Sequence, residues 1–185
     1  MQLITLLVSI LLGLNSFATS YSGVMARKKN RLIFKNYVDN KSYVLVPSNP
    51  LISTYLDKLS YGDYVSFDGL KDRSQQAELT VNALNYIGLK SLLGVWAGDD
   101  SYCYSFINFT EFTISPRLKK SKCATSFSPT HTYILSPTSN TWAILISGSQ
   151  TSYIGDLKFE NASTVQIELF DSETGAIIKT LRLKK

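Results

Sequence analysis

The stretch Leu79-Thr80-Val81-Asn82-Ala83-Leu84-Asn85-Tyr86-Ile87 alternates along the chain, so that Leu79, Val81, Ala83, Asn85 and Ile87 fall on one side. Successive side chains of a strand point to opposite faces, and this pattern therefore predicts a β-strand with one face turned to a core. Aromatic residues make up 12% of the chain, and they favour strands. The sequence thus indicates an all-β protein. A platform on which sugars or bases stack is the alternative use of so many rings.

Other segments repeat the pattern of a strand followed by a turn. Two strands are expected around the turn Asp39-Asn40-Lys41, and a third follows the turn Tyr61-Gly62-Asp63. After residue 98, short strands recur at a spacing of roughly ten residues, which is typical of a barrel or sandwich. The expected strands are 31–38, 42–46, 64–67, 79–87, 102–107, 110–114, 132–135, 141–146, 153–159, 164–170 and 176–183.

One helix is expected, over Pro50–Leu59. Proline suits a first turn, and either Ser48 or Asn49 can cap the helix. Leu51, Tyr55, Leu56 and Leu59 share a face, which is the spacing of an amphipathic helix.

Residues 31–88 resemble an OB-fold. The likeness lies in strands around one short helix and in the pattern Leu59-x-x-Gly62-Asp63-x-Val65-x-Phe67-x-Gly69. The resemblance implies a small barrel, and we place this domain at 27–90.

Residues 94–183 are similar to a lipocalin-like barrel, on the motif Gly94-x-Trp96 and an arginine, Arg182, on the last expected strand. The resemblance implies an antiparallel meander barrel or sandwich over 91–185. Trp96 is expected to be buried at the junction of the two halves, because Leu89, Leu92, Leu93 and Val95 precede it, and the resemblance implies that Arg182 lies against its ring. Trp142 is expected to be the more exposed tryptophan.

The first 26 residues carry no charged side chain, and the run Leu3–Leu14 is almost continuously apolar. Ser16-Phe17-Ala18 follows, a pattern that signal peptidase cleaves, so residues 1–18 are predicted to be a signal peptide of an exported protein, secreted or periplasmic. A basic cluster at Arg27–Arg31 instead favours an uncleaved membrane anchor. A buried helix of an intracellular protein is the third alternative.

Cys103 and Cys123 are the two cysteines, and in an exported domain they are expected to form a disulfide. With one histidine and no Cys-x-x-Cys motif, neither a metal site nor a cofactor is expected.

Asp99 and Asp100 are adjacent and are expected to point apart in a solvated turn, with calcium ligation as the alternative. Asn40, Asn108 and Asn161 begin glycosylation sequons, which matter in a eukaryotic secretory pathway.

The net charge is +5, from 19 basic and 14 acidic residues. The basic residues form short clusters, two of them near the ends of the predicted mature chain, so a solvated surface is expected and nucleic acid is not. Membrane association is expected only if the leader is retained.

The sequence contains no convergent set of catalytic groups. His131 follows Pro129 at the start of an expected strand, where we expect a surface histidine. We therefore expect a non-catalytic binding or structural module of the cell envelope that engages a protein or glycan through a β surface. The alternatives are a small-barrel carrier of an apolar ligand and a hydrolase with a cryptic site at His131.

Overall fold

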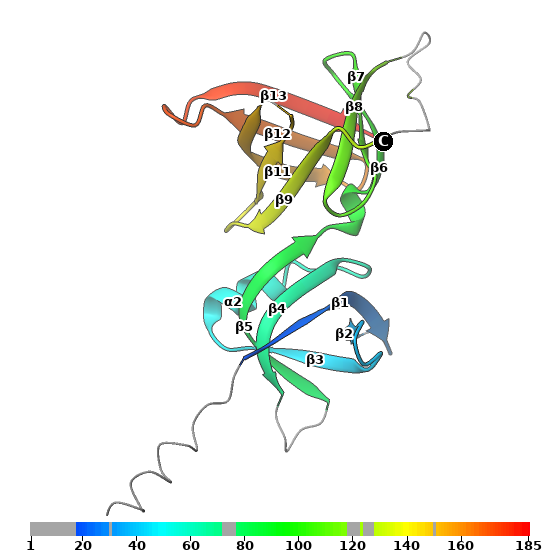
Figure 1. Cartoon of the computed structure of the whole chain (residues 1–185), viewed down its shortest axis with the longest axis vertical. Coiled ribbons are helices and arrows are strands. Elements are labelled where there is room, and N and C mark those ends of the chain that lie inside the picture. Colours follow the sequence, from blue (N-terminus) through cyan, green and yellow to red (C-terminus); the bar gives the residue numbers. More distant parts are fainter. Residues whose placement is uncertain (1–17, 30, 72–76, 118–122, 124–127, 150) are drawn as a thin grey trace, which may run out of the picture.

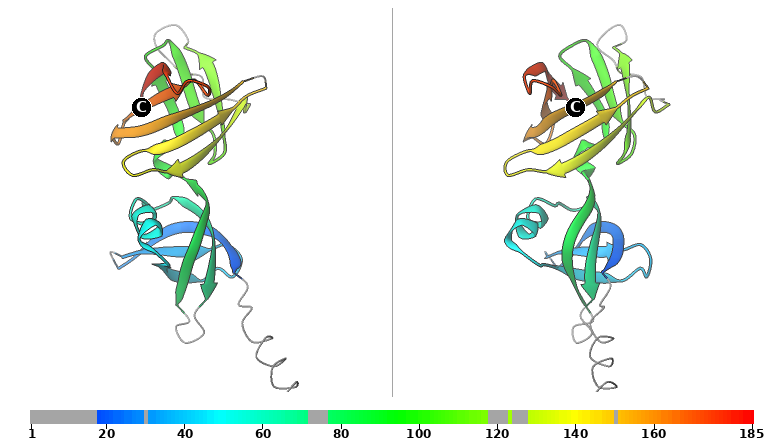
Figure 2. Two further views of the ribbon diagram at one scale, coloured as in Figure 1. Left: turned by 90° about the vertical axis from the view of Figure 1, so that its left-hand side faces the viewer. Right: turned by 60° about the vertical axis from the view of Figure 1, so that its left-hand side comes forward.

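The computed structural model describes residues 18–29, 31–71, 77–117, 123, 128–149 and 151–185. Within them the chain forms two β-barrels stacked along the long axis of the molecule, and strand β5 (Glu78–Gly88) leads from one to the other (Figures 1 and 2). The prediction of an all-β fold with one short α-helix is confirmed. Of the predicted leader, residues 1–17 lie outside the described residues. No helix of the described part is long and apolar enough to span a membrane.

The first barrel has the strand order β1-β2-β3-β5-β4, and β4 pairs again with β1. Neighbouring strands are antiparallel except β3 and β5, which run parallel. The α-helix α2 (Pro50–Leu56) connects β3 to β4, which is the arrangement expected of an OB-like barrel. The other strands of this barrel are β1 (Thr19–Lys28), β2 (Arg31–Asn36), β3 (Ser42–Pro47) and β4 (Tyr64–Lys71).

Helix α2 begins where its capping residues predict. The Asn49 Oδ1 atom accepts a hydrogen bond from the backbone N–H of Ile52 at 3.0 Å, and Pro50 occupies the first turn. Of the two candidate caps, Asn49 is therefore the residue used. The helix ends at Leu56, three residues earlier than expected.

The strict alternation along β5 is wrong in its middle. Leu79, Val81 and Ile87 are buried, but Ala83 and Asn85 are exposed. The register between β4 and β5 shifts at two places, between Ser66/Phe67 and between Asp68/Gly69, so β5 carries extra residues there. Each bulge reverses the face to which the following side chains point.

The second barrel is an eight-stranded antiparallel meander that closes on itself. Each strand pairs with the next one in the chain, and β13 returns to pair with β6. This is the up-and-down barrel expected of a lipocalin-like domain. Its strands are β6 (Gly94–Gly98), β7 (Tyr102–Phe106), β8 (Glu111–Pro116), β9 (His131–Pro137), β10 (Trp142–Ser147), β11 (Ser152–Asn161), β12 (Thr164–Phe170) and β13 (Ile177–Lys184).

Two strands, β1 and β6, were not among those expected. Strand β1 begins at Thr19, directly after the predicted cleavage position, so the first barrel starts before residue 27. The division into domains at 27–90 and 91–185 stays a prediction. Strand β6 contains Trp96 and pairs with both β7 and β13.

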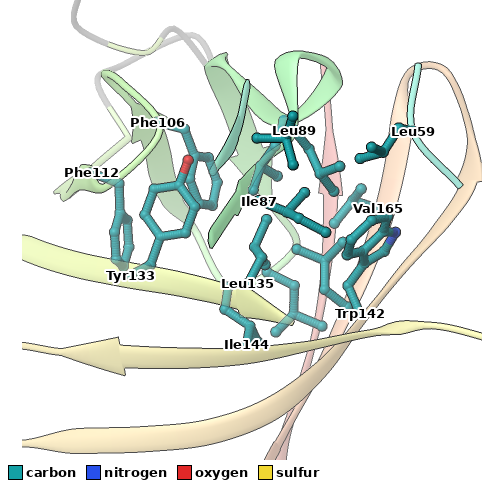
Figure 3. Packing of buried hydrophobic residues seen from close by; sticks show 14 of the residues in the cluster. Leu59, Ile87, Leu89, Phe106, Phe112, Tyr133, Leu135, Trp142, Ile144 and Val165 are labelled. Atoms are coloured by element: carbon teal, nitrogen blue, oxygen red, sulfur yellow. The ribbon is translucent and has the colours of Figure 1, made fainter. Parts of the chain in front are cut away.

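The two barrels share a packed junction. Leu59, from the connection between α2 and β4, lies in one cluster with Ile87 and Leu89 of the linking segment and with Trp142 and Val165 of the second barrel (Figure 3). Ile87 also pairs with Leu135 across β5 and β9. The end of the second barrel that faces the first is therefore filled with side chains.

Polar contacts reinforce this junction. Asp63 is only 2% exposed, and its carboxylate accepts hydrogen bonds from the backbone N–H groups of Ser60 at 2.7 Å and Lys90 at 2.8 Å. Burial raises the pKa of this carboxyl group. Lys58, from the connection between α2 and β4, donates from Nζ to the carbonyl oxygens of Thr138 and Thr141, between β9 and β10 of the second barrel.

Trp96 is fully buried, as predicted, but its cationic neighbour is different. The indole Nε1–H donates to the Leu92 carbonyl oxygen at 2.7 Å, and the Lys185 Nζ atom lies 4.6 Å from the ring centroid. Arg182 instead pairs with Glu160 at 2.5 Å on the surface. The placement of Arg182 against Trp96 is therefore wrong: Lys185, three residues further on, lies over the ring. Trp142 is also buried, at 8% exposed.

Cys103 and Cys123 lie at disulfide distance, with 1.98 Å between their sulfur atoms. Cys103, on β7, is fully buried. The pair fixes residue 123, in the connection between β8 and β9, against β7.

Candidate functional site

Packing inside the second barrel loosens with distance from the junction. Along β12 the inward side chains are Val165, Ile167 and Leu169, which are 0%, 2% and 6% exposed. Strand β13 runs antiparallel to β12. Its Leu183 and Leu181 are buried, whereas Lys179, which pairs with Leu169, is exposed. The barrel therefore has a closed end at the junction and a more open end away from it.

An apolar cavity of about 300 Å³ lies in this more loosely packed part. This volume is at the lower end of the ~300–1,000 Å³ typical of ligand pockets. Aromatic and aliphatic side chains form most of its wall. The lining residues are Tyr104, Phe106, Phe112, Ile114, His131, Ile146, Tyr153, Ile167, Leu169, Ile178, Lys179 and Leu181.

A small polar network lies at one side of the cavity. Asp100 accepts hydrogen bonds from the Tyr104 hydroxyl and from Lys179 Nζ, both at 2.7 Å. Partial burial acts to raise the pKa of Asp100, but the hydrogen bonds from Lys179 and Tyr104 and the charge of Lys179 together hold it below its ordinary value. Burial, and then the hydrogen bond to Asp100, raises the pKa of the Tyr104 hydroxyl. Lys179 and Asp100 are thus already partnered, and the interior offers mainly apolar surface.

His131, for which a surface position was expected, is half-buried and lines the cavity. Its Nδ1 atom lies 2.7 Å from Thr130 Oγ1, and its ring packs against Phe112 with 5.1 Å between centroids. A Cβ atom at Gly148 would approach the same ring to 2.9 Å. The histidine therefore packs as part of the wall and makes a polar contact with the neighbouring threonine.

The adjacent carboxylates Asp99 and Asp100 have separate partners. Asp99 Oδ1 accepts a hydrogen bond from the backbone N–H of Arg182 at 3.2 Å, whereas Asp100 faces Tyr104 and Lys179. Within the described ranges, no group of three or more His, Cys, Asp or Glu side chains could hold a metal ion.

Of the residues that line the cavity, sequence reasoning singled out His131, as a candidate for hydrolysis and not as part of an apolar wall. The alternation of β10 and β12 predicts which side chains point inward, so the signal for an interior wall was present. Nothing in that alternation shows where along the barrel the filling is incomplete.

Comparison of the chain with protein-family models, with curated proteins and with solved structures finds no match.

Proposed function

We propose that this protein is a non-catalytic binding protein whose eight-stranded barrel holds a small, mainly apolar molecule. The observation that carries the proposal is the cavity of about 300 Å³ inside a closed barrel, with ten apolar or aromatic residues among the twelve that line it. Removing apolar surface from water is the main source of affinity in such a site, at roughly 25 cal/mol per Å².

Because one end of the barrel is closed, a carrier function is favoured over a channel. Trp142, Val165 and Leu135 fill the barrel at the junction, and Leu59 covers it from the first barrel (Figure 3). A ligand therefore enters from the end of the barrel that lies away from the junction.

We also propose that the protein is exported, to the periplasm or the extracellular space. Two observations support this: strand β1 begins at Thr19, directly after the predicted cleavage position, and the two cysteines lie at disulfide distance. N-terminal sequencing of the native protein tests the proposal. A chain beginning at Thr19 is expected, and an intact Met1 in the membrane fraction would establish an anchor instead.

Within the described residues, the hydrolase alternative gains one hydroxyl but no carboxylate beside the histidine. The His131 Nδ1 atom lies 2.7 Å from Thr130 Oγ1, and the ring packs on Phe112. A carboxylate that orients the histidine would be needed to favour that alternative.

Binding of N-phenyl-1-naphthylamine, an uncharged fluorescent probe, tests the cavity. Ile146 lines the cavity. Its neighbour in β10, Leu145, points out of the barrel and is 39% exposed. Ile146→Trp reduces the free volume, so the affinity is expected to fall about tenfold or more, equivalent to roughly 1.4 kcal/mol. Leu145→Trp adds the same side chain outside the barrel and should leave binding unchanged.

Equal probe affinity in the two variants, each shown to be folded by circular dichroism, would contradict the proposal. Native mass spectrometry of the protein purified from its own host then identifies the ligand that it carries.

A further inference from the structure

A second candidate site lies where the two barrels meet on the outside. It is an open groove of about 440 Å³, which we call the aromatic groove. Strands β4 and β5 of the first barrel provide part of it, and the turn between β7 and β8 of the second provides the rest. Its lining residues are Tyr64, Ser66, Tyr86, Asn108, Phe109 and Thr110.

Tyr64 is the central ring of the groove. Its centroid lies 5.8 Å from that of Tyr86, 5.8 Å from that of Phe109 and 6.1 Å from that of Tyr37. The rings of Tyr64 and Phe109 are stacked, with 26° between their planes, and Tyr37 extends the row into solvent at 57% exposed. The rings contact one another, so the row is a continuous aromatic surface.

The groove is fixed before any ligand arrives. The Tyr86 hydroxyl donates to the Phe109 carbonyl oxygen, and the Tyr133 hydroxyl donates to that of Asn108 at 2.9 Å. Gly88 leaves the space that the Phe109 ring occupies, because a Cβ atom there would come within 2.6 Å of the ring. A preformed site loses little freedom when it binds, which favours affinity.

The polar groups of the groove are neutral. Among the described residues that line it there is no charged side chain, only hydroxyl and amide groups beside the rings. The hydroxyls of Tyr64 and Ser66 have no hydrogen-bond partner within the described part of the chain. Nucleic acid is disfavoured, because its phosphates require lysine or arginine. A polyproline segment is disfavoured too, because such segments dock into slots between rings, and here the rings touch.

The geometry points to a neutral saccharide as the occupant of the aromatic groove. The C–H face of a sugar ring lies on the Tyr64 row, while its hydroxyls bond to the hydroxyls of Ser66 and Tyr64. This site is separate from the cavity of the second barrel and does not depend on the function proposed for it.

Isothermal titration calorimetry with cellotetraose, mannotetraose and chitotetraose tests the inference. Wild-type protein is expected to bind at least one of them. Tyr64→Ala and Tyr37→Ala should each weaken that binding, Tyr64→Ala by about tenfold or more. Tyr102→Ala is the matched control, because Tyr102 is 44% exposed at the far end of β7, and it should bind as the wild type does. Tyr37 is exposed, so its loss should leave the junction intact. Tyr37→Ala therefore tests the inference even if Tyr64→Ala disturbs the junction.

Absence of binding to all three saccharides, or binding that is equal in all variants, would overturn the inference. So would binding of decaproline or oligothymidylate that is lost in Tyr64→Ala, since it would assign the groove to a peptide or to single-stranded DNA. N-phenyl-1-naphthylamine binding, measured on the same samples, reports the cavity of the second barrel and separates failure of one proposal from failure of the other.

Discussion

Replacing Trp96 by phenylalanine tests how the second barrel is closed at the junction. The indole is fully buried and its Nε1–H donates to the Leu92 carbonyl oxygen at 2.7 Å. Phenylalanine keeps an aromatic ring in the site but has no donor. The Leu92 carbonyl group is then left buried and unpaired, which costs about 1–3 kcal/mol.

The smaller ring adds a second cost. An indole exceeds a phenyl ring by roughly 40 Å³, and at about 24 cal/mol per Å³ of residual cavity the void costs about 1 kcal/mol. Trp96→Phe is therefore expected to lower the free energy of unfolding by about 2–4 kcal/mol. Trp142→Phe is the matched control: Trp142 is 8% exposed, and within the described residues its indole nitrogen has no hydrogen-bond acceptor. Phenylalanine keeps an aromatic face for the neighbouring lysine at both positions, so Trp142→Phe should cost only about 1 kcal/mol, from the void.

Urea denaturation followed by circular dichroism measures both variants, and each retains one tryptophan as a fluorescent reporter. The midpoint should fall further for Trp96→Phe than for Trp142→Phe. Equal losses of stability in the two variants would refute the reasoning, because they would show that the hydrogen bond to Leu92 contributes nothing.

Three further predictions concern single contacts. Reduction of the Cys103–Cys123 pair should lower the free energy of unfolding by roughly 2–4 kcal/mol, measured by urea denaturation with and without reductant, and two free thiols in the unreduced, unfolded protein would contradict it. Asp100→Asn should destabilise the protein at neutral pH, because the folded state holds the pKa of this carboxyl below its ordinary value despite partial burial. This contribution is present above about pH 4 and is lost as the pH falls through the lower folded-state pKa. The free energies of unfolding of the variant and the wild type, measured at decreasing pH, should therefore converge there. Lys58→Met should loosen the junction, because Lys58 donates to two carbonyl groups of the second barrel and lies 5.7 Å from the centroid of the Trp142 ring; faster hydrogen exchange at Trp142 measures this, and unchanged exchange would contradict it.

Much of the fold could be predicted because the signals are local. The alternation of Trp142, Ile144 and Ile146 defines β10, and an asparagine before a proline defines the start of α2. Strand β1 escaped prediction because residues 19–28 contain small and polar side chains without clear alternation, next to an apolar leader. Its pairing with β2 and β4 is long-range, and such pairing is not visible in a local pattern.

The errors arise where tertiary structure changes a local rule. The bulges in β5 depend on its pairing with β4, and they reverse the faces of Ala83 and Asn85. The cation over Trp96 depends on where the last strand ends: β13 stops at Lys184, and Lys185 then folds back to donate to the Ser91 carbonyl oxygen at 2.9 Å. Both results follow from contacts between distant segments, so neither could be obtained from spacing alone.

The segment Phe106-Ile-Asn-Phe109-Thr-Glu-Phe112 shows why the candidate sites were harder to find than the fold. Phe106 and Phe112 pair across β7 and β8 and stack at 5.1 Å on the cavity wall (Figure 3), as strand phenylalanines are expected to do. Phe109 lies between them in the turn, where it has left the alternation and packs on Tyr64 of the other barrel. Identical side chains three residues apart therefore serve different surfaces. Composition and spacing account for the pair in the strands, whereas the role of Phe109 requires knowing that a second barrel lies beside the turn.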